Sequence, residues 1–111
     1  VIYGDGEQSR DFTYVANAVH ANLLAVAEPR ASGQVFNVAG GEPTRISELA
    51  SMLKNLIGSS APIRYTDPRP GDVRHSYADI SKAREILGYE PRVSSREGLS
   101  NTVVYFRKSL L

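Results

Sequence analysis

The sequence predicts an α/β fold with about four helices and several short strands. Apolar residues recur at helical spacing in four separate segments, and short β-type runs lie between these segments. Glycines and prolines punctuate the 111 residues between the segments. The strands are too few for a complete sheet, so the sequence predicts one incomplete α/β domain over residues 1–111.

The first half of the chain is predicted to hold three extended segments and two helices. The extended segments cover residues 1–3, 10–13 and 34–38. The helices cover residues 14–28, which Pro29 ends, and residues 45–57, with Thr44 as the expected N-cap and Gly58 as the left-handed residue after the helix. Asn17 is expected to cap the first of these helices or to lie in its first turn.

The second half is predicted to hold two extended segments and two further helices. The extended segments cover residues 62–66, where Pro62 indicates an edge strand, and residues 76–78. One helix begins at Asp79 or Ser81 and closes at Gly88. The other begins with a capping box from Ser94 to Glu97 and places Leu99, Val103, Phe106 and Leu110 on one face.

The composition excludes several classes of function. The net charge of +1 gives no global attraction to nucleic acid. The chain has no cysteine and only two histidines, His20 and His75, so no metal site is expected. No apolar run approaches the roughly 20 residues of a membrane-spanning helix. No signal peptide is visible, so a cytoplasmic location is expected.

Polar residues at segment ends and in constrained loops are the candidates for a binding site: Arg10 after a glycine-rich turn, Asn37 before Gly40-Gly41, and Arg69 with Asp72. Two arginines can share the charge of a diphosphate, and an aspartate can accept hydrogen bonds from sugar hydroxyls. Purely structural roles for these residues are the alternative. Arg10 and Asp11 can form a surface pair of little worth, and Asn37 can satisfy a loop amide.

Catalytic residues are not expected in this chain. None of the six tyrosines has a lysine four residues later, and no glycine-rich turn joins a strand to a helix. No serine, histidine and aspartate form a pattern that suggests a triad. The residues taken alone therefore predict a chain that binds a ligand and does not catalyse.

The order of short motifs resembles the C-terminal third of the extended short-chain dehydrogenase/reductase family. It is most similar to NAD-dependent nucleotide-sugar epimerases and dehydratases of the UDP-glucose 4-epimerase type. The motifs are Ile2-Tyr3-Gly4-Asp5-Gly6, Arg10-Asp11-Phe12-x-Tyr14-Val15, Phe36-Asn37-Val38-x-Gly40-Gly41, Arg69-Pro70-Gly71-Asp72, and Ala78-Asp79-x-Ser81-Lys82-Ala83 with Leu87-Gly88-Tyr89-x-Pro91. Each motif is weak alone, and five in this order are specific together.

The resemblance implies roles for six residues. Ile2 and Tyr3 would line the substrate, Arg10 and Arg69 would contact its diphosphate, Asn37 would lie near the nucleotide, and Asp72 would hydrogen-bond the ribose. In that family an N-terminal Rossmann domain binds NAD and carries the catalytic tyrosine and lysine. This chain shows neither, and it has Asn17 where members of the family usually have aspartate.

The chain begins with Val1 inside a predicted strand, and its one methionine is Met52. This start favours the absence of a larger N-terminal part, although a removed tag explains it equally. Without an NAD domain, the apolar stripe containing Val15, Leu23 and Val35 would lack its partner. An exposed patch of this kind favours association, so a homodimer is expected.

The sequence therefore predicts the UDP-sugar-binding portion of an NAD-dependent epimerase, inactive alone and without a cofactor of its own. A fragment of a dehydratase or decarboxylase of the same family is the near alternative. A stand-alone binding or assembly module without enzymatic activity is the alternative of another class.

Overall fold

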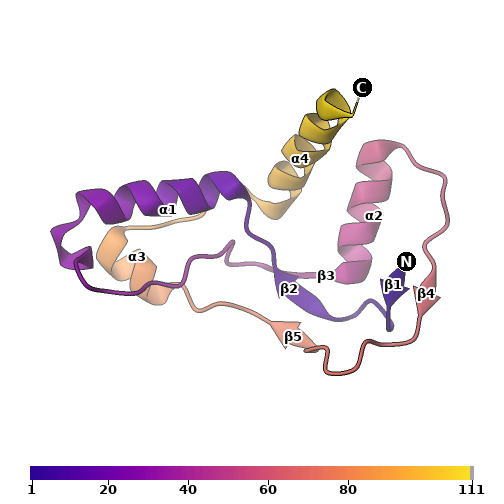
Figure 1. The fold of residues 1–111 in the computed structure, drawn as a ribbon, viewed down its shortest axis with the longest axis horizontal. Helices are drawn as coiled ribbons and strands as arrows, with labels where there is room; N and C mark the ends of the chain where they lie inside the picture. The colour runs from indigo at the N-terminus through magenta and orange to yellow at the C-terminus, as the bar shows by residue number, and fades with distance from the viewer. Residues whose placement is uncertain (111) are drawn as a thin grey trace.

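The computed structural model describes residues 1–110 and shows an elongated, flat arrangement of helices around short strands (Figure 1). Its principal extents are 50 × 36 × 17 Å. The elements in chain order are β1 (Ile2–Tyr3), β2 (Ser9–Asp11), α1 (Val15–Ala27), the 3-10 turn η1 (Pro29–Ala31), β3 (Pro43–Arg45), α2 (Ile46–Ile57), β4 (Tyr65–Thr66), β5 (His75–Ser76), α3 (Ser81–Leu87) and α4 (Ser95–Ser109). The predicted α/β class is confirmed, and so are the four helices of the described residues.

The strands form two small sheets. β1 pairs in parallel with β4, where Ile2 lies opposite Tyr65. In the second sheet the order is β3-β2-β5, so β2 is the central strand. β2 runs antiparallel to β3 and parallel to β5. The first half of the chain therefore meets residues 65–76 twice, once in each sheet.

The buried core lies between α1 and α3. Its members are mostly small or aliphatic: Ala21, Ala39, Ile80, Ala83, Leu87 and Tyr89. Tyr89 has no exposed surface, and its hydroxyl donates to the carbonyl oxygen of Ala39 at 2.7 Å. The alanines allow close approach of α1 and α3, and the tyrosine fills the remaining space with its polar end satisfied.

Three helix termini follow the prediction, and the start of α3, where Ile80 takes the cap position, follows it in part. The hydroxyl of Ser94 accepts from the backbone N–H of Glu97 at 3.2 Å, which confirms Ser94 as the cap of α4. A carboxylate oxygen of Asp79 accepts from the N–H of Ser81 at 2.9 Å at the start of α3. Gly58 and Gly88 follow their helices in the left-handed conformation, as predicted.

The cap of α2 differs from the prediction. Thr44 does not cap this helix, because it belongs to β3 and pairs with Arg10 of β2. Arg45 takes the cap position, and its N–H donates to the carboxylate of Glu48 at 3.1 Å. The next two amides of α2 donate to the carbonyls of Gln8 and Gly6 at 3.0 and 2.9 Å. The chain between β1 and β2 thus satisfies amides that a helix leaves unpaired.

The predicted strand over residues 34–38 is wrong. Its residue types favour extended structure, but no strand within residues 1–110 pairs with this segment. The N–H of Gln34 donates back to Ala31, and the ammonium of Lys82 donates to the carbonyl of Val35. β-type residues form a strand only when a neighbouring strand supplies ladder hydrogen bonds, and this segment has none. The predicted strand over residues 62–66 is shorter than expected for the same reason.

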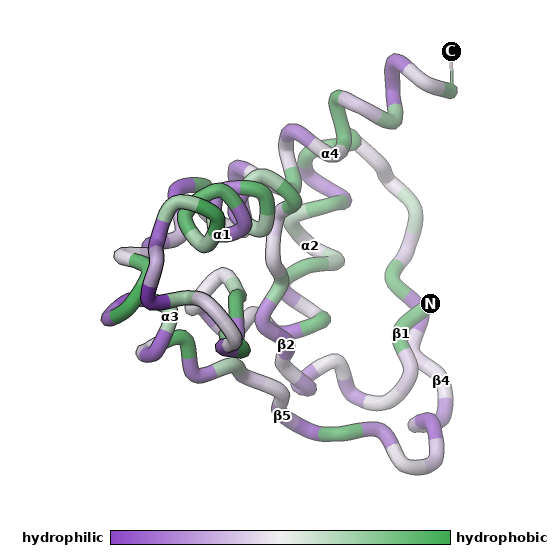
Figure 2. Tube along the Cα trace, turned by 60° about the vertical axis from the view of Figure 1, so that its left-hand side comes forward, coloured by the Kyte–Doolittle hydropathy of each residue, from purple (hydrophilic) through white to green (hydrophobic). Residues whose placement is uncertain are grey.

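Several apolar residues of α1 are exposed to solvent, and Figure 2 colours the hydrophobic residues along that helix green. Val15 and Leu23 are each 65% exposed, and Val35 is 82% exposed. These are the residues that the sequence predicted to lack a partner. No helix of the described residues is long and apolar enough to cross a membrane.

Candidate functional site

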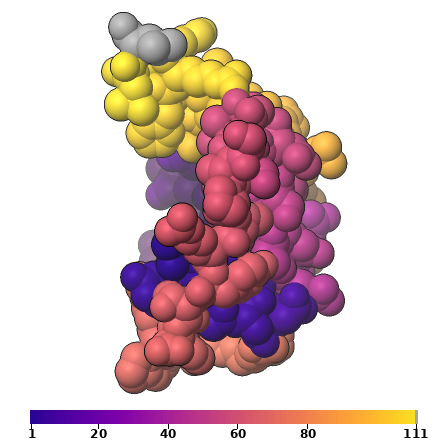
Figure 3. Space-filling view, turned by 90° about the vertical axis from the view of Figure 1, so that its right-hand side faces the viewer, coloured from indigo at the N-terminus to yellow at the C-terminus, as the bar shows by residue number. Residues whose placement is uncertain are grey.

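A cavity of about 450 Å³ lies between the turn that follows β1 and the loop that follows β4. Figure 3 shows these two parts of the chain, indigo and salmon, packed against each other at one end of the molecule. The residues that line the cavity are Tyr3, Gly4, Asp5, Gln8, Thr66, Asp67, Pro68, Arg69, Asp72, Val73 and Arg74. The parallel pairing of β1 with β4 fixes the two walls relative to each other.

Tyr3 and Arg69 form an aromatic and cationic wall of this cavity. The guanidinium carbon of Arg69 lies 4.0 Å from the centre of the Tyr3 ring, within the range of a cation–π contact. Tyr3 is 42% exposed, so ring surface remains open to a ligand. In the described part of the chain, Arg69 forms no ion pair with a carboxylate. Its charge is therefore available to an anion.

Arg10 is held beside the cavity by Asp72. Its Nη2 donates to Oδ1 of Asp72 at 2.7 Å, while its Nη1 donates to the carbonyl of Ser9 at 2.7 Å. Both side chains are about one third exposed, so the pair is accessible from solvent. Only Oδ1 of Asp72 is engaged by this contact, which leaves Oδ2 to accept from a ligand hydroxyl. The arrangement brings together a phosphate-binding cation and a hydroxyl acceptor.

The alternative pair of Arg10 with Asp11 is not formed. The carboxylate of Asp11 instead accepts from the backbone N–H groups of Gly40 and Gly41, at 2.8 and 3.2 Å. A Cβ atom at Gly40 would lie 2.6 Å from the carbonyl oxygen of Phe12, so only glycine fits there. Asp11 therefore has a structural role, and Arg10 pairs with Asp72 instead.

The remaining candidates lie outside the cavity wall. Ile2 is buried in β1 directly before Tyr3, so its side chain lies on the opposite face of the strand, and it does not line the cavity. Asn37 is exposed on the segment that runs past α3, and it does not line the cavity. Of the six candidates, the structure therefore brings together Tyr3, Arg10, Arg69 and Asp72.

Three cavity residues were not predicted from the sequence. Arg74 donates to both carboxylate oxygens of Asp5, at 2.8 and 3.0 Å. The hydrogen bond from Glu7 N–H, followed by that from Arg74, lowers the pKa of the Asp5 carboxyl. Gln8 is buried and donates to the carbonyl oxygen of Tyr3 at 2.7 Å. The Gly4-Asp5-Gly6 turn was visible in the sequence, but its partner 69 residues away was not.

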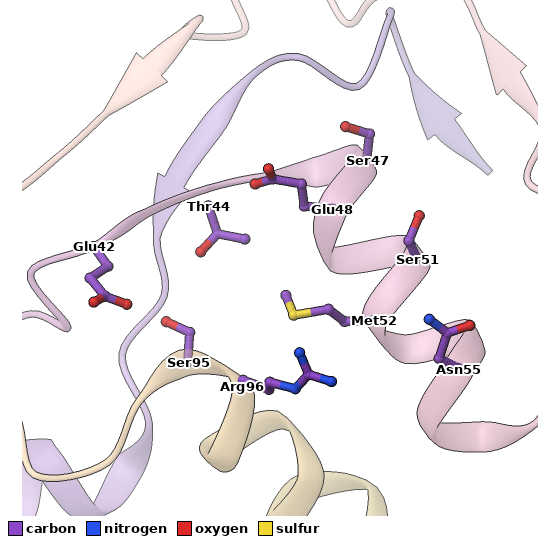
Figure 4. A pocket seen from close by; sticks show the side chains of 9 residues that line it. All are labelled: Glu42, Thr44, Ser47, Glu48, Ser51, Met52, Asn55, Ser95 and Arg96. Carbon is purple, nitrogen blue, oxygen red and sulfur yellow. The ribbon is translucent and has the colours of Figure 1, made fainter.

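A second cavity, of about 560 Å³, lies between α2 and the start of α4 (Figure 4). Its side chains are mainly small or polar, with Arg96 on one side and Glu48 on the other. It contains no predicted candidate and no aromatic residue. The charged, aromatic-lined cavity beside β1 is therefore the better candidate. Within residues 1–110, no group of three or more His, Asp or Glu side chains is placed to hold a metal ion.

The fold is a partial α/β domain with a cavity that Arg69 and Arg74 help to line. Residues 1–102 match the family model described as GDP-mannose 4,6 dehydratase. The chain belongs to the NAD-dependent nucleotide-sugar epimerase/dehydratase family. It is 39% identical over 106 residues to the UDP-glucose 4-epimerase of Mycolicibacterium smegmatis, covering 96% of this chain and 34% of that protein.

Solved structures give the same relationship. The UDP-glucose 4-epimerase of Thermotoga maritima, determined with UDP-glucose, matches with a TM-score of 0.91 and 47% identity, covering 99% of this chain and 35% of that one. The UDP-glucuronic acid 4-epimerase of Bacillus cereus, determined with UDP-glucuronic acid and NAD, matches with a TM-score of 0.87 and 36% identity, covering 97% and 35%. The chain thus spans about a third of the length of these relatives.

Within residues 1–110, no strand leads into a helix through a glycine-rich turn. A dinucleotide pyrophosphate binds where a strand passes through a glycine-rich turn into a helix. Here β3 runs directly into α2, and the cap residue is Arg45. No step through NAD is therefore assigned to these residues.

Proposed function

We propose that this chain is the nucleotide-sugar-binding portion of an NAD-dependent sugar epimerase, equivalent to the C-terminal region of such enzymes, with a UDP-sugar as ligand. The observation that carries the proposal is the convergence of Tyr3, Arg69 and Asp72 on one cavity, with Arg10 paired to Asp72. These residues come from three segments and were selected by their chemistry. The UDP-glucose in the Thermotoga maritima structure supports the choice of ligand.

Each group has a distinct part in the proposed binding. Arg69, with no carboxylate partner, takes phosphate oxygens of the ligand by charge-assisted hydrogen bonds. Asp72 accepts from ribose hydroxyls through its free Oδ2, and Arg10 supplies the second cation. The open surface of the Tyr3 ring packs against the flat or apolar part of the ligand.

The isolated chain is expected to bind the nucleotide-sugar without catalysing its conversion. Inversion at a sugar carbon through oxidation and reduction needs a hydride acceptor and a base that moves the hydroxyl proton. The Tyr-x-x-x-Lys pattern of that base is absent from these 111 residues. In the proposal, NAD and the catalytic tyrosine belong to another part of the complete enzyme.

Calorimetric titration with UDP-glucose tests the proposal. We expect measurable binding, and we expect Arg10→Ala and Arg69→Ala each to weaken it by roughly tenfold or more, since a hydrogen bond to a charged group contributes about 1.5–3 kcal/mol. Arg30→Ala is the matched control, because Arg30 pairs with Glu28 far from the cavity in sequence. Absence of binding at millimolar UDP-glucose would refute the proposal.

A dehydratase portion is the second candidate, and the description of the matching family model favours it. The family model's description names GDP-mannose, whereas the epimerase structures hold UDP-sugars. Parallel titrations with UDP-glucose and GDP-mannose separate the two functions. Stronger binding of GDP-mannose would replace the epimerase proposal by the dehydratase one.

We further propose that the chain forms a homodimer through the exposed apolar face of α1. Four valine and leucine side chains of this face are each more than half exposed: Val15, Val19, Leu23 and Val26. Burial of such a face on a second copy removes apolar surface from water, which favours association.

A further inference from the structure

Arg74 and Asp5 form an ion pair across the mouth of the cavity beside β1. The Nη1 of Arg74 lies 2.8 Å from Oδ1 and 3.0 Å from Oδ2 of Asp5. Both side chains line the cavity, and they are 57% and 55% exposed. The pair joins residues that are 69 positions apart, and it adds a side-chain contact beyond the β1–β4 pairing, which ends with the bond from Gly4 N–H to the carbonyl of Thr66.

Asp5 occupies a turn whose conformation depends on two glycines. Gly4 has a φ of 83° and Gly6 a φ of 79°, values that glycine adopts without strain. Such a turn has many accessible conformations in the absence of further contacts. Asp5 restricts them, because its Oδ1 also accepts from the N–H of Glu7 at 2.9 Å. Tyr3, a proposed ligand contact, lies immediately before this turn.

The backbone of Arg74 contacts strand β2. Its carbonyl oxygen accepts from the N–H of Ser9 at 2.9 Å and from Nη1 of Arg10 at 3.5 Å. Asp72, which holds Arg10, is only two residues away. Arg74 therefore contacts the turn after β1 through its side chain and strand β2 through its main chain.

We propose that Arg74 is a positioning residue of the nucleotide-sugar site, whose ion pair with Asp5 holds the turn after β1 at a fixed distance from the loop carrying Arg69. The inference rests on the proposed function. Arg74 acts through Asp5 and does not contact the ligand. The pair holds Tyr3 and Arg69 in their binding positions before the ligand binds. Less conformational entropy is therefore lost on binding.

The test compares UDP-glucose affinities of the wild-type chain, Arg74→Ala, Asp5→Asn and the double variant, because asparagine keeps an oxygen that accepts from Glu7 N–H and loses the charge that pairs with Arg74. Exposed ion pairs contribute modestly, so we expect Arg74→Ala to weaken binding roughly 2- to 5-fold. We expect Asp5→Asn to weaken binding by a similar factor, and the double variant to bind no more weakly than either single variant, because each change removes the same ion pair. Thermal unfolding of each variant verifies that it is folded.

Arg84→Ala is the matched control, because Arg84 forms a comparable exposed pair with Glu90, at 2.8 Å, away from this cavity. We expect this variant to bind as the wild type does. Unchanged affinity of Arg74→Ala overturns the inference. Unchanged or tighter binding by Asp5→Asn also overturns it, because Arg74 would then act as a cation on the ligand. Failure of the wild-type chain to bind overturns the proposed function itself, which distinguishes the two outcomes.

Discussion

At the residue scale, Asn17 joins two segments that lie far apart in the sequence. It is 1% exposed, and its amide nitrogen donates to the carbonyl of Val93 at 2.8 Å. Its amide oxygen accepts from the N–H groups of Arg92 and Val93, at 2.9 and 3.0 Å. Asn17 lies in the first turn of α1, one of the two predicted places, but it serves the chain before α4. A carboxylate could accept the two N–H groups but could not donate to the Val93 carbonyl.

Replacement of Asn17 tests this role. Asn17→Asp replaces the donor by a charged oxygen facing the Val93 carbonyl, so we expect a loss of about 1–3 kcal/mol in the free energy of unfolding. Denaturant unfolding at pH 7 measures it. Asn22→Asp is the control, since Asn22 is exposed on the same helix. Equal stabilities of the two variants would show that the Asn17 contacts contribute nothing.

The ionisation of Tyr89 is expected to lower the stability of the chain at high pH. Burial, aided by the charge of Asp11, raises the pKa of the Tyr89 hydroxyl above its usual value of 10.0. The folded state thus favours the neutral phenol, whose stabilisation is complete below pH 10 and declines as the pH rises through the folded-state pKa.

The check is thermal unfolding of the wild type and Tyr89→Phe between pH 7 and pH 11. At pH 7 we expect Tyr89→Phe to be less stable by about 1 kcal/mol, because the bond to Ala39 is lost. The difference should shrink or reverse above pH 10, since phenylalanine does not titrate. A difference independent of pH would exclude the assigned pKa shift.

At the element scale, Gly98 sets how closely α4 approaches the start of α1. A Cβ atom at this position would lie 2.7 Å from Cβ and Cγ of Tyr14. Alanine normally stabilises a helix by about 1 kcal/mol relative to glycine. Here the clash outweighs that gain, so we expect Gly98→Ala to destabilise the chain by about 1–3 kcal/mol in denaturant unfolding. Asn101→Ala, at an exposed position of α4, should be neutral or stabilising.

The helices were predicted better than the strands because their information is local. The predicted helix over residues 14–28 is observed as Val15–Ala27, and the Ser94 cap of α4 is observed as predicted. Helical periodicity and caps are contained within one segment. The strand predicted at residues 34–38 failed because pairing depends on a second segment that a pattern does not reveal.

The same distinction applies to the candidate site. Arg10, Arg69 and Asp72 were selected because arginine and aspartate in constrained loops suit a phosphate and a sugar hydroxyl. Their convergence follows from the pairing of β1 with β4 and of β2 with β5. Arg74 was missed because its partner, Asp5, is fixed only by that tertiary arrangement.

At the scale of the whole molecule, the chain is more open than a typical domain of its length. Its radius of gyration is 16.5 Å, whereas a compact domain of this length has about 13 Å. Its accessible surface is 7647 Å², against about 6,000 Å² for a compact protein of this mass. The excess is sufficient for a protein–protein interface of ordinary size. The open shape therefore agrees with the proposed homodimer.

Sedimentation velocity tests that association. We expect the wild-type chain to form dimers at high concentration, and Leu23→Glu to shift it toward monomer by placing a charge in the exposed face of α1. Asn22→Glu, one residue away on the same helix, should leave the dimer intact. A wild-type chain that sediments as a clean monomer at high concentration would contradict the proposal.

The most direct test of the central claim is an NMR titration of the chain with UDP-glucose, in which each backbone amide reports its own surroundings. We expect the largest shifts at Gly4, Asp5, Arg69 and Asp72, around the cavity beside β1, and small shifts at Leu23 on the exposed face of α1. Shifts centred on the cavity between α2 and α4, or no shifts at millimolar ligand, would contradict it.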